Sequence, residues 1–365
     1  TRQNIQYNWI ELSEIANLLR ELSSVGLHAI QTSGKATRNI TADPLSGLTE
    51  GEIADARPYC ELIRRWFNLH PEFSWLPGKF KIAVNGAKLD ETALRVHDLG
   101  LRLVRNKEGE LGFTVYVGGG LGAAAMVAAE TASFVPCEDI LSYLESAMRI
   151  YNLKGRRDHL KKLRIKFLVR ELGAEEYSRL VYEDWKQTRD DPKLKLNLTH
   201  LSELKKDFAL PIKPLVLEGF EDKVDFNYSI WKKNNVRAHK ISGYSIVNVS
   251  LTKLGTAPGD ATSEQMRILA DLADQYSYSE LRTTKRQTIV FPHVRKDQVF
   301  DLWQSLEKYG LASPHQGTLA QIVACPGGDY CDLAKAVSIP IATRVQQRFD
   351  DMDKLLDIGD LNINI

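Results

Sequence analysis

A repeated segment constrains the fold of this chain more than any other feature of its sequence. Residues 1–5 read Thr-Arg-Gln-Asn-Ile and residues 285–289 read Lys-Arg-Gln-Thr-Ile, an offset of 284 positions. The offset persists through the next segment, where both copies carry an apolar stripe with helical spacing and end at Gly-Leu. The stripes consist of Ile15, Leu18, Leu19 and Leu22, and of Val299, Leu302, Trp303 and Leu306. A constant offset over so many positions predicts a duplicated fold.

The second copy predicts alternating strands and helices. Residues 244–251 alternate like a strand, a helix over about 263–276 follows with Thr262 or Ser263 as its N-cap, and a strand lies near 280–291. With the striped helix this makes strand–helix–strand–helix, half of a ferredoxin-like sandwich. The first copy starts at the equivalent of the second strand, so we expect its opening strand and helix to be absent from this sequence.

The region between the copies is predicted to be α+β. Helices are expected at about 57–70, 90–97, 137–151 and 174–187, and strands at 79–86, 99–106 and 111–118. After the second copy a helix near 343–357 and a strand at 361–365 repeat the pattern of 57–70 and 79–86. The predicted division is therefore the second half of a ferredoxin-like unit (1–30), a first α+β domain (31–187), a weakly packed linker (188–240), a second ferredoxin-like unit (241–312) and the start of a second α+β domain (313–365).

Composition narrows the class of protein. The 365 residues carry a formal net charge of +1, which gives no sign of a nucleic-acid coat or a membrane surface. The chain has no run of 18 or more apolar residues, so no transmembrane helix is expected. Four cysteines in so long a chain argue against a disulfide framework and favour a reducing, cytoplasmic location. Cys60 and Cys137 are interpreted as packing residues.

Cys325 and Cys331 are the first candidates for chemistry. Two thiols separated by five residues, with Gly327 and Gly328 to bend the backbone, can point at one metal centre. Soft thiolate ligands suit zinc or an iron–sulfur cluster, and a pair supplies only two of four ligands. Two buried thiols in a loop remain the alternative.

Two further groups of residues could bind an anion or a flat cofactor. Lys79 and Lys81 alternate with apolar residues, so both point to one face of a strand, where they repel unless an anion lies between them. Arg2 and Arg38 are the cations grouped with them, and a solvated basic face is the alternative. Gly118–Gly120 follow a strand and could cradle an anion with their amides, or could simply form a tight turn.

Together these segments resemble the sulfite/nitrite reductase haemoprotein family. The resemblance rests on five stretches in family order, at residues 1–9, 31–39, 76–81, 118–121 and 324–331. The internal repeat is also a feature of that family. The implied fold is a pseudo-twofold duplicated α+β fold with ferredoxin-like half-domains and a larger region that binds sirohaem and a cluster.

The resemblance implies a set of site residues. Cys325 and Cys331 match the first of two cysteine pairs that hold a [4Fe–4S] cluster, and the second pair is expected just beyond Ile365, outside this sequence. The anion-binding residues of the family match Arg2, Arg38, Lys79 and Lys81. Donors to the sirohaem carboxylates are expected among Thr32, Ser33, Thr37, Asn39 and Gly118–Gly120, with Gln3, Arg282 and Gln287 as weaker candidates by repeat position.

The function implied is the six-electron reduction of sulfite to sulfide, with nitrite reduction to ammonia by the same site as the alternative. The sequence has no flavin or nicotinamide motif, so a separate electron donor is expected, either ferredoxin or a flavoprotein. A non-catalytic paralogue that uses the fold for binding, and a zinc protein using Cys325 and Cys331, also remain open.

Overall fold

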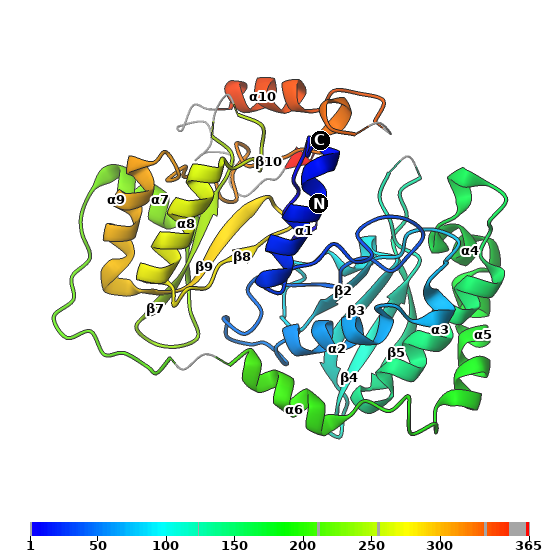
Figure 1. Ribbon diagram of the computed structural model, residues 1–365. Coiled ribbons are helices and arrows are strands. Elements are labelled where there is room, and N and C mark those ends of the chain that lie inside the picture. Colours follow the sequence, from blue (N-terminus) through cyan, green and yellow to red (C-terminus); the bar gives the residue numbers. More distant parts are fainter. Residues whose placement is uncertain are drawn as a thin grey trace. The chain divides into compact units, whose positions relative to one another are not determined.

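The computed structural model describes residues 2–122, 124–209, 212–253, 256–331, 334–349 and 363–364. Its contacts divide the chain into two units (Figure 1). Unit 1 comprises Thr1–Ile10, Leu48–Glu50 and Ile212–Ile365, and unit 2 comprises Glu11–Gly47 and Gly51–Pro211. The predicted boundaries near 30 and 240 therefore differ from the observed division, which falls near residues 10 and 211.

Unit 1 is built on a four-stranded sheet in the order β6-β7-β9-β8. Its strands are β6 (Val236–Ala238), β7 (Tyr244–Ser250), β8 (Arg282–Thr283) and β9 (Thr288–Arg295), all paired antiparallel. The helices α7 (Phe226–Asn235), α8 (Ser263–Tyr276) and α9 (Val299–Lys308) share one apolar core with β7 and β9. The predicted strand at 280–291 is two strands, because β8 turns back and pairs with β9.

The helices of the repeat have the same local structure. Helix α1 (Ile15–Ser24) follows a 3-10 turn at Leu12–Glu14, and α9 follows one at Lys296–Gln298, both at the offset of 284. The Leu27 N–H donates to the Leu22 carbonyl (2.9 Å), as the Leu311 N–H donates to the Leu306 carbonyl (2.8 Å). Gly26 and Gly310 both have positive φ, which is the Schellman ending expected of a Gly-Leu terminus.

The two copies differ in burial and in their strands. The stripe of α9 is buried, whereas no residue of α1 is buried and Leu19 is 43% exposed. Residues 4–10, the equivalents of β9, form no strand in the described chain. A strand needs a hydrogen-bonding neighbour, and β9 has two, β7 and β8. The prediction of a strand at the start of the first copy is therefore wrong for the described residues.

Unit 2 contains a five-stranded sheet in the order β1-β2-β3-β4-β5. Strands β1 (Thr41–Ala42), β2 (Ile82–Asn85) and β3 (Leu99–Arg105) are parallel, whereas β4 (Leu111–Val117) and β5 (Ala129–Pro136) are added antiparallel. The predicted strands at 99–106 and 111–118 are confirmed as β3 and β4, joined by a turn in which the Gly109 N–H bonds the Asn106 carbonyl (3.1 Å).

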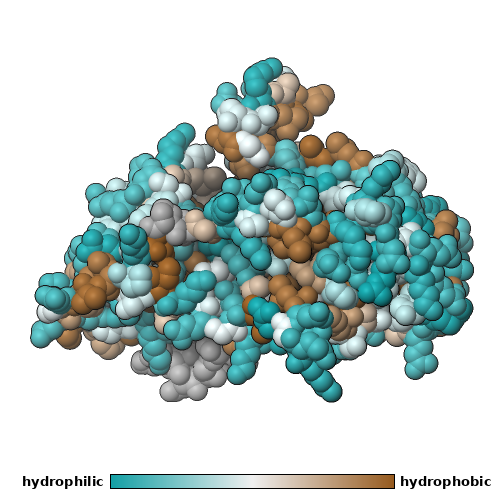
Figure 2. Space-filling model, turned by 90° about the horizontal axis from the view of Figure 1, so that it is seen from below, coloured by the Kyte–Doolittle hydropathy of each residue, from teal (hydrophilic) through white to brown (hydrophobic). Residues whose placement is uncertain are grey.

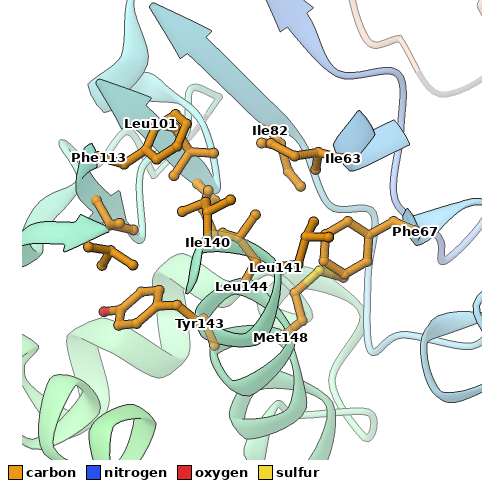
Figure 3. Packing of buried hydrophobic residues seen from close by; sticks show 14 of the residues in the cluster. Ile63, Phe67, Ile82, Leu101, Phe113, Ile140, Leu141, Tyr143, Leu144 and Met148 are labelled. Atoms are coloured by element: carbon orange, nitrogen blue, oxygen red, sulfur yellow. The ribbon is translucent and has the colours of Figure 1, made fainter. Parts of the chain in front are cut away.

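The core of unit 2 lies between the five-stranded sheet and the helices that pack against it. Helix α3 (Ile140–Lys154) inserts Ile140, Leu144 and Met148 between strand residues and helix α2 (Arg57–Phe67), as Figure 3 shows. Helices α4 (Ile165–Leu172), α5 (Ala174–Thr188) and α6 (Leu198–Asp207) also belong to the unit, as does α1. Cys60 and Cys137 belong to this core, which confirms them as packing residues, and burial raises the pKa of both thiols.

Two sequence predictions are corrected in this part of the chain. The segment 90–97 is not a helix beyond a 3-10 turn at Leu94–Val96, because Ala93, directly before that turn, has a left-handed backbone (φ +55°) that interrupts an α-helix. The Asp90 carboxylate binds the N–H groups of Thr92 (3.1 Å) and Leu94 (2.8 Å). The segment 188–240 is a weakly packed linker only in part, because just residues 212–225 are mostly exposed and without helix or strand. It carries α6 and α7, and places Leu201 and Trp231 in the two cores.

The predictions for the end of the chain are tested only in part. Helix α10 (Ile339–Arg348) begins four residues before the predicted helix, and the rest of that prediction, 350–357, lies outside the described residues. Strand β11 (Ile363–Asn364) pairs parallel with β10 (Ile322–Val323), and the remainder of 361–365 also lies outside them.

Hydrophilic residues cover most of the face shown in Figure 2, with apolar patches scattered among them. Among the described residues, no helix has the length and apolar character needed to cross a membrane.

The cap of α8 allows a test of how the ferredoxin-like unit is stabilised. The Thr262 hydroxyl accepts from the Gln265 N–H (3.1 Å), and the Gln265 side chain accepts from the Thr262 N–H (3.0 Å), a complete capping box. We expect Thr262→Ala to lower the free energy of unfolding by about 1 kcal/mol in chemical denaturation. Ser263→Ala, one exposed residue further on, is the control and should change it by less than about 0.5 kcal/mol.

Candidate functional site

The sheet of unit 2 brings most of the predicted site residues of that unit to one edge. Strands β1, β2 and β3 run parallel and start at this edge, and the antiparallel β4 ends there. Arg38 lies shortly before β1, Lys81 directly before β2, and Gly118 directly after β4. Residues far apart in sequence are therefore neighbours, and we call Arg38, Lys79, Lys81 and Gly118–Gly120 the basic edge.

Hydrogen bonds to Phe80 hold the first two segments of the basic edge together. The Arg38 N–H donates to the Phe80 carbonyl (2.7 Å) and the Phe80 N–H donates to the Ala36 carbonyl (3.1 Å), a parallel bridge that extends the sheet. The Phe80 ring is fully buried, whereas Lys79 is exposed and Lys81 partly exposed. This is the predicted alternation, with both cations on the face away from the core.

Asp98 joins Lys81 to two other segments. One carboxylate oxygen, Oδ2, accepts from the Lys81 N–H (2.9 Å), and the other, Oδ1, accepts from the Arg164 guanidinium (2.7 Å from Nη2). The Asp98 carbonyl accepts from the Gly118 N–H (3.0 Å). Burial raises the pKa of the Asp98 carboxyl, and the charge and hydrogen bonds of Arg164 oppose that rise.

Two of the three glycines of the basic edge are required by the backbone, one by its conformation and one by close packing. Gly118 has φ +93°, and a Cβ on Gly119 would lie 2.4 Å from the Arg95 carbonyl oxygen. The Gly120 N–H donates to the Met126 carbonyl (2.9 Å) and the Gly118 N–H donates to Asp98, so two of the three predicted amide donors already bond within the chain. Of the three N–H groups, the one on Gly119 is therefore the best remaining candidate, among the described residues, for the predicted donor to an anion.

Lys166 anchors the loop after the glycines. Its ammonium donates to the carbonyls of Leu121 (3.1 Å) and Ala124 (2.6 Å), although the residue is buried. Burial lowers the pKa of the Lys166 ammonium, the nearby Arg164 lowers it further, and Asp98 raises it. Arg164 and Lys166 flank the first residue of α4, so the start of this helix is tied to the basic edge.

The loop before β1 carries buried donors that the described chain leaves unused. The Thr37 hydroxyl and the Arg38 Nε are both buried and have no hydrogen-bond partner among the described residues. The Arg38 guanidinium otherwise donates to the carbonyls of Thr32 and Gly34, and burial lowers its pKa. Because an unsatisfied buried donor costs about 1–3 kcal/mol, both donors fit a ligand rich in acceptor oxygens.

The other predicted donors of this loop are less enclosed. Thr32 and Ser33 are exposed, and the Thr32 hydroxyl donates to the Ala29 carbonyl (2.9 Å). Asn39 is partly buried. Their contact with a cofactor stays a prediction.

The remaining predicted residues belong to unit 1. Arg2 and Gln3 are partly buried, and Gln3 and Gln287 share a left-handed backbone (φ +50° and +58°) at the repeat offset. Arg282 pairs with Glu280 (2.6 Å). Arg2 belongs to unit 1 and the basic edge to unit 2, so the place of Arg2 in the cation group stays a prediction.

Gln287 is bonded to the cysteine loop. Its amide nitrogen donates to the Ala324 carbonyl (2.9 Å), and its amide oxygen accepts from the Ala324 N–H (3.0 Å). Ala324 directly precedes Cys325, so both backbone groups beside the first candidate ligand are fixed by one side chain. A positioning role for Gln287 is therefore visible, whereas its predicted contact with a cofactor is not tested.

The cysteine pair lies on an accessible loop. Cys325 is exposed, Cys331 is partly buried, and both are free thiols. Gly327 has φ +63°, and a Cβ there would lie 2.7 Å from the Ser338 nitrogen. No group of three or more His, Cys, Asp or Glu side chains in the described part of the chain is arranged to hold a metal ion.

Sequence reasoning missed Asp98, Arg164 and Lys166. A single aspartate before a strand has no distinguishing local pattern, and its partner Arg164 lies 66 residues away. The only signal for Arg164 and Lys166 was their place in a basic segment, residues 154–166, which runs into the first turn of the apolar helix α4.

These features define a duplicated α+β protein with a ferredoxin-like half-domain, and two family models match it. The model "Nitrite and sulphite reductase 4Fe-4S domain" matches residues 33–189, and "Nitrite/Sulfite reductase ferredoxin-like half domain" matches residues 252–309. Together they cover more than half of the chain, which belongs to the nitrite and sulfite reductase family. The basic edge lies inside the first match, and Cys325 and Cys331 lie outside both.

Known proteins resemble the chain over its whole length. Sulfite reductase [ferredoxin] 1 of Mycolicibacterium paratuberculosis is 27% identical over 98% of this chain and 58% of its own length. The chloroplastic ferredoxin–nitrite reductase of Arabidopsis thaliana is 28% identical over 92% of this chain and 53% of its own. The structure of the Mycobacterium tuberculosis NirA protein has the same fold, with a TM-score of 0.77 and 24% identity over 100% of this chain and 61% of that one. The chain spans a little over half the length of these relatives.

The bonds between Gln287 and Ala324 predict a local effect on the cysteine loop. We expect Gln287→Ala to speed hydrogen exchange of the Ala324 N–H about tenfold or more, because that buried group loses its acceptor. Site-resolved exchange by mass spectrometry measures this, with Gln304→Ala, an exposed glutamine on α9, as the control. Equal exchange at Ala324 in both variants would show that Gln287 does not hold the loop.

Proposed function

We propose that this chain supplies the anion-binding part of an enzyme that reduces sulfite to sulfide with six electrons. The observation that carries the proposal is the basic edge, where hydrogen bonds of the backbone bring the segments of Arg38, Lys79 and Lys81 together beside the Gly118–Gly120 turn. Cations gathered on one face repel each other unless an anion lies among them. Relatives named as ferredoxin-dependent sulfite reductases support sulfite as that anion.

Sirohaem, when bound, would supply the reducing iron centre, and a [4Fe–4S] cluster would pass electrons to it. The Thr37 hydroxyl and the Arg38 Nε fit the carboxylates of sirohaem, because both are buried donors without a partner in the described chain. Cys325 and Cys331 are free thiols on a loop open to a cluster, and they would be two of its four ligands. The other two ligands are proposed to lie outside this sequence.

The cations of the basic edge have two tasks. The Arg38 guanidinium stays charged at every working pH, so it can hold a substrate oxygen through the whole reaction. Reduction of sulfite to sulfide takes up six protons and releases three oxygens as water. The Nζ atoms of Lys79 and Lys81 can help to hold the oxyanion and can each donate a proton to a departing oxygen, and exposed Lys79 can recover one from solvent. Arg2 is proposed to act with them.

Nitrite reduction to ammonia is the second candidate. The chain is as similar to the Arabidopsis nitrite reductase as to the sulfite reductases, and the same cations would hold either oxyanion. The names of these relatives support ferredoxin as the electron donor, and a flavoprotein reductase is the alternative. We place the enzyme in the cytoplasm, where thiols stay reduced and free to bind a cluster.

Turnover of lysine variants tests the proposal in the full-length protein. We expect Lys81→Met to lower kcat for sulfite by about 10²-fold or more with little loss of sirohaem, because a general acid contributes about 10²–10⁴. Reduction is followed with a reduced dye, and nitrite is assayed in parallel. Lys88→Met, an exposed lysine beyond β2, is the control and should keep wild-type turnover. Loss of sirohaem instead of kcat would overturn the proton-donor role, and a wild-type protein that reduces neither anion would overturn the function.

A further inference from the structure

Asp98 is a carboxylate with no solvent exposure to which the proposed reaction assigns no task. It nevertheless contacts three segments of the chain around this edge. Its side chain binds the Lys81 N–H and the Arg164 guanidinium, and its backbone carbonyl binds the Gly118 N–H. A buried carboxylate is retained in a fold only where its partners compensate the loss of water.

The Lys81 peptide is held on both sides by this part of the chain. Its N–H donates to the Asp98 carboxylate (2.9 Å) and its carbonyl accepts from the Leu99 N–H (3.1 Å). The side chain of a lysine is flexible, so the reach of its ammonium depends on where the backbone is fixed. Phe80 is bonded to the opposite neighbour, the Arg38 loop, so a shift at Lys81 would also move the arginine.

Arg164 keeps the Asp98 carboxylate in this orientation. Its Nε and Nη2 both bond the same oxygen, Oδ1, at 2.9 and 2.7 Å, which leaves Oδ2 directed at the Lys81 N–H. The charged groups facing Asp98 are Arg164 and Lys81, with Lys166 next to them. One carboxylate therefore binds two partners, the Arg164 guanidinium in an ion pair and the Lys81 backbone N–H in a hydrogen bond.

We propose that Asp98 is the positioning residue of the anion site, which fixes the backbone of Lys81 so that its ammonium meets the substrate oxyanion. This inference rests on the proposed function. It assigns Asp98 a role separate from its ion pair with Arg164. If the ion pair were its only role, Asp98 would contribute to the stability of the fold alone. The bond to the Lys81 N–H makes Asp98 a determinant of substrate affinity as well.

Two double variants of the full-length protein separate these roles. Asp98→Asn with Arg164→Gln removes both charges and keeps a side-chain oxygen that can accept from the Lys81 N–H. Asp98→Leu with Arg164→Met removes the same charges and also that acceptor, and an apolar replacement of a buried ion pair is often tolerated. If leucine does not fit, Asp98→Ala with Arg164→Met removes the same acceptor with a smaller side chain.

Two measurements are made on both proteins, the KM for sulfite and the hydrogen exchange of individual amides. We expect the Asp98→Leu pair to have a KM at least about tenfold above that of the Asp98→Asn pair, with equal sirohaem content. We also expect its Lys81 N–H to exchange at least about tenfold faster. The Gly118 N–H, bonded to the backbone carbonyl of residue 98, should stay protected in both and reports local unfolding.

The outcomes distinguish this inference from the proposed function. Equal KM values and equal Lys81 exchange in the two double variants would show that Asp98 serves only Arg164, and would overturn the inference. Faster Lys81 exchange with an unchanged KM would also overturn it, because the bond would then not govern affinity. A wild-type protein without turnover contradicts the function instead, and the Lys81 exchange still shows whether Asp98 fixes that backbone.

Discussion

The buried carboxylate of Asp98 is the point on which the arrangement of the basic edge depends. The carboxylate bonds the segment before β2 and the start of α4 to the start of β3. The backbone carbonyl of Asp98 bonds the Gly118 N–H, directly after β4. In a sheet with three parallel strands and one antiparallel neighbour, these chain ends must all come to one edge. The topology brings the cations together, and the hydrogen bonds of Phe80 and Asp98 hold them there.

The duplication shows how one local structure can serve two purposes. Helices α1 and α9 share their length, preceding turn and glycine ending, because these depend on nearby residues that the repeat preserves. They differ in burial, which depends on what packs against them. At Gln287 the second copy uses a strained backbone and an amide side chain to hold Ala324 beside Cys325, and Gln3 keeps the same backbone in the first copy.

Local signals predicted the parts of the fold that local interactions decide. Helix α8 and its Thr262 cap follow from a capping sequence and an apolar period, and β3 and β4 from a hairpin pattern. The helix expected at 90–97 does not form because Ala93 has a left-handed backbone, which interrupts an α-helix. The linker expected at 188–240 is wrong for α6 and α7, because Leu201 and Trp231 pack against apolar residues far away in sequence. Arg38, Lys79, Lys81 and the glycines could be named from motifs, whereas Asp98 and Arg164 could not, because only the folded chain brings them together.

The optical spectrum and metal content of the purified full-length protein test the central claim most directly. The proposed roles of Thr37 and Arg38 toward sirohaem, and of Cys325 and Cys331 toward a cluster, predict a Soret band, a long-wavelength haem band, and iron in excess of the haem iron. A colourless, iron-free preparation of the complete protein would contradict that claim and favour a non-catalytic binding protein. Zinc without iron would assign Cys325 and Cys331 to a different centre.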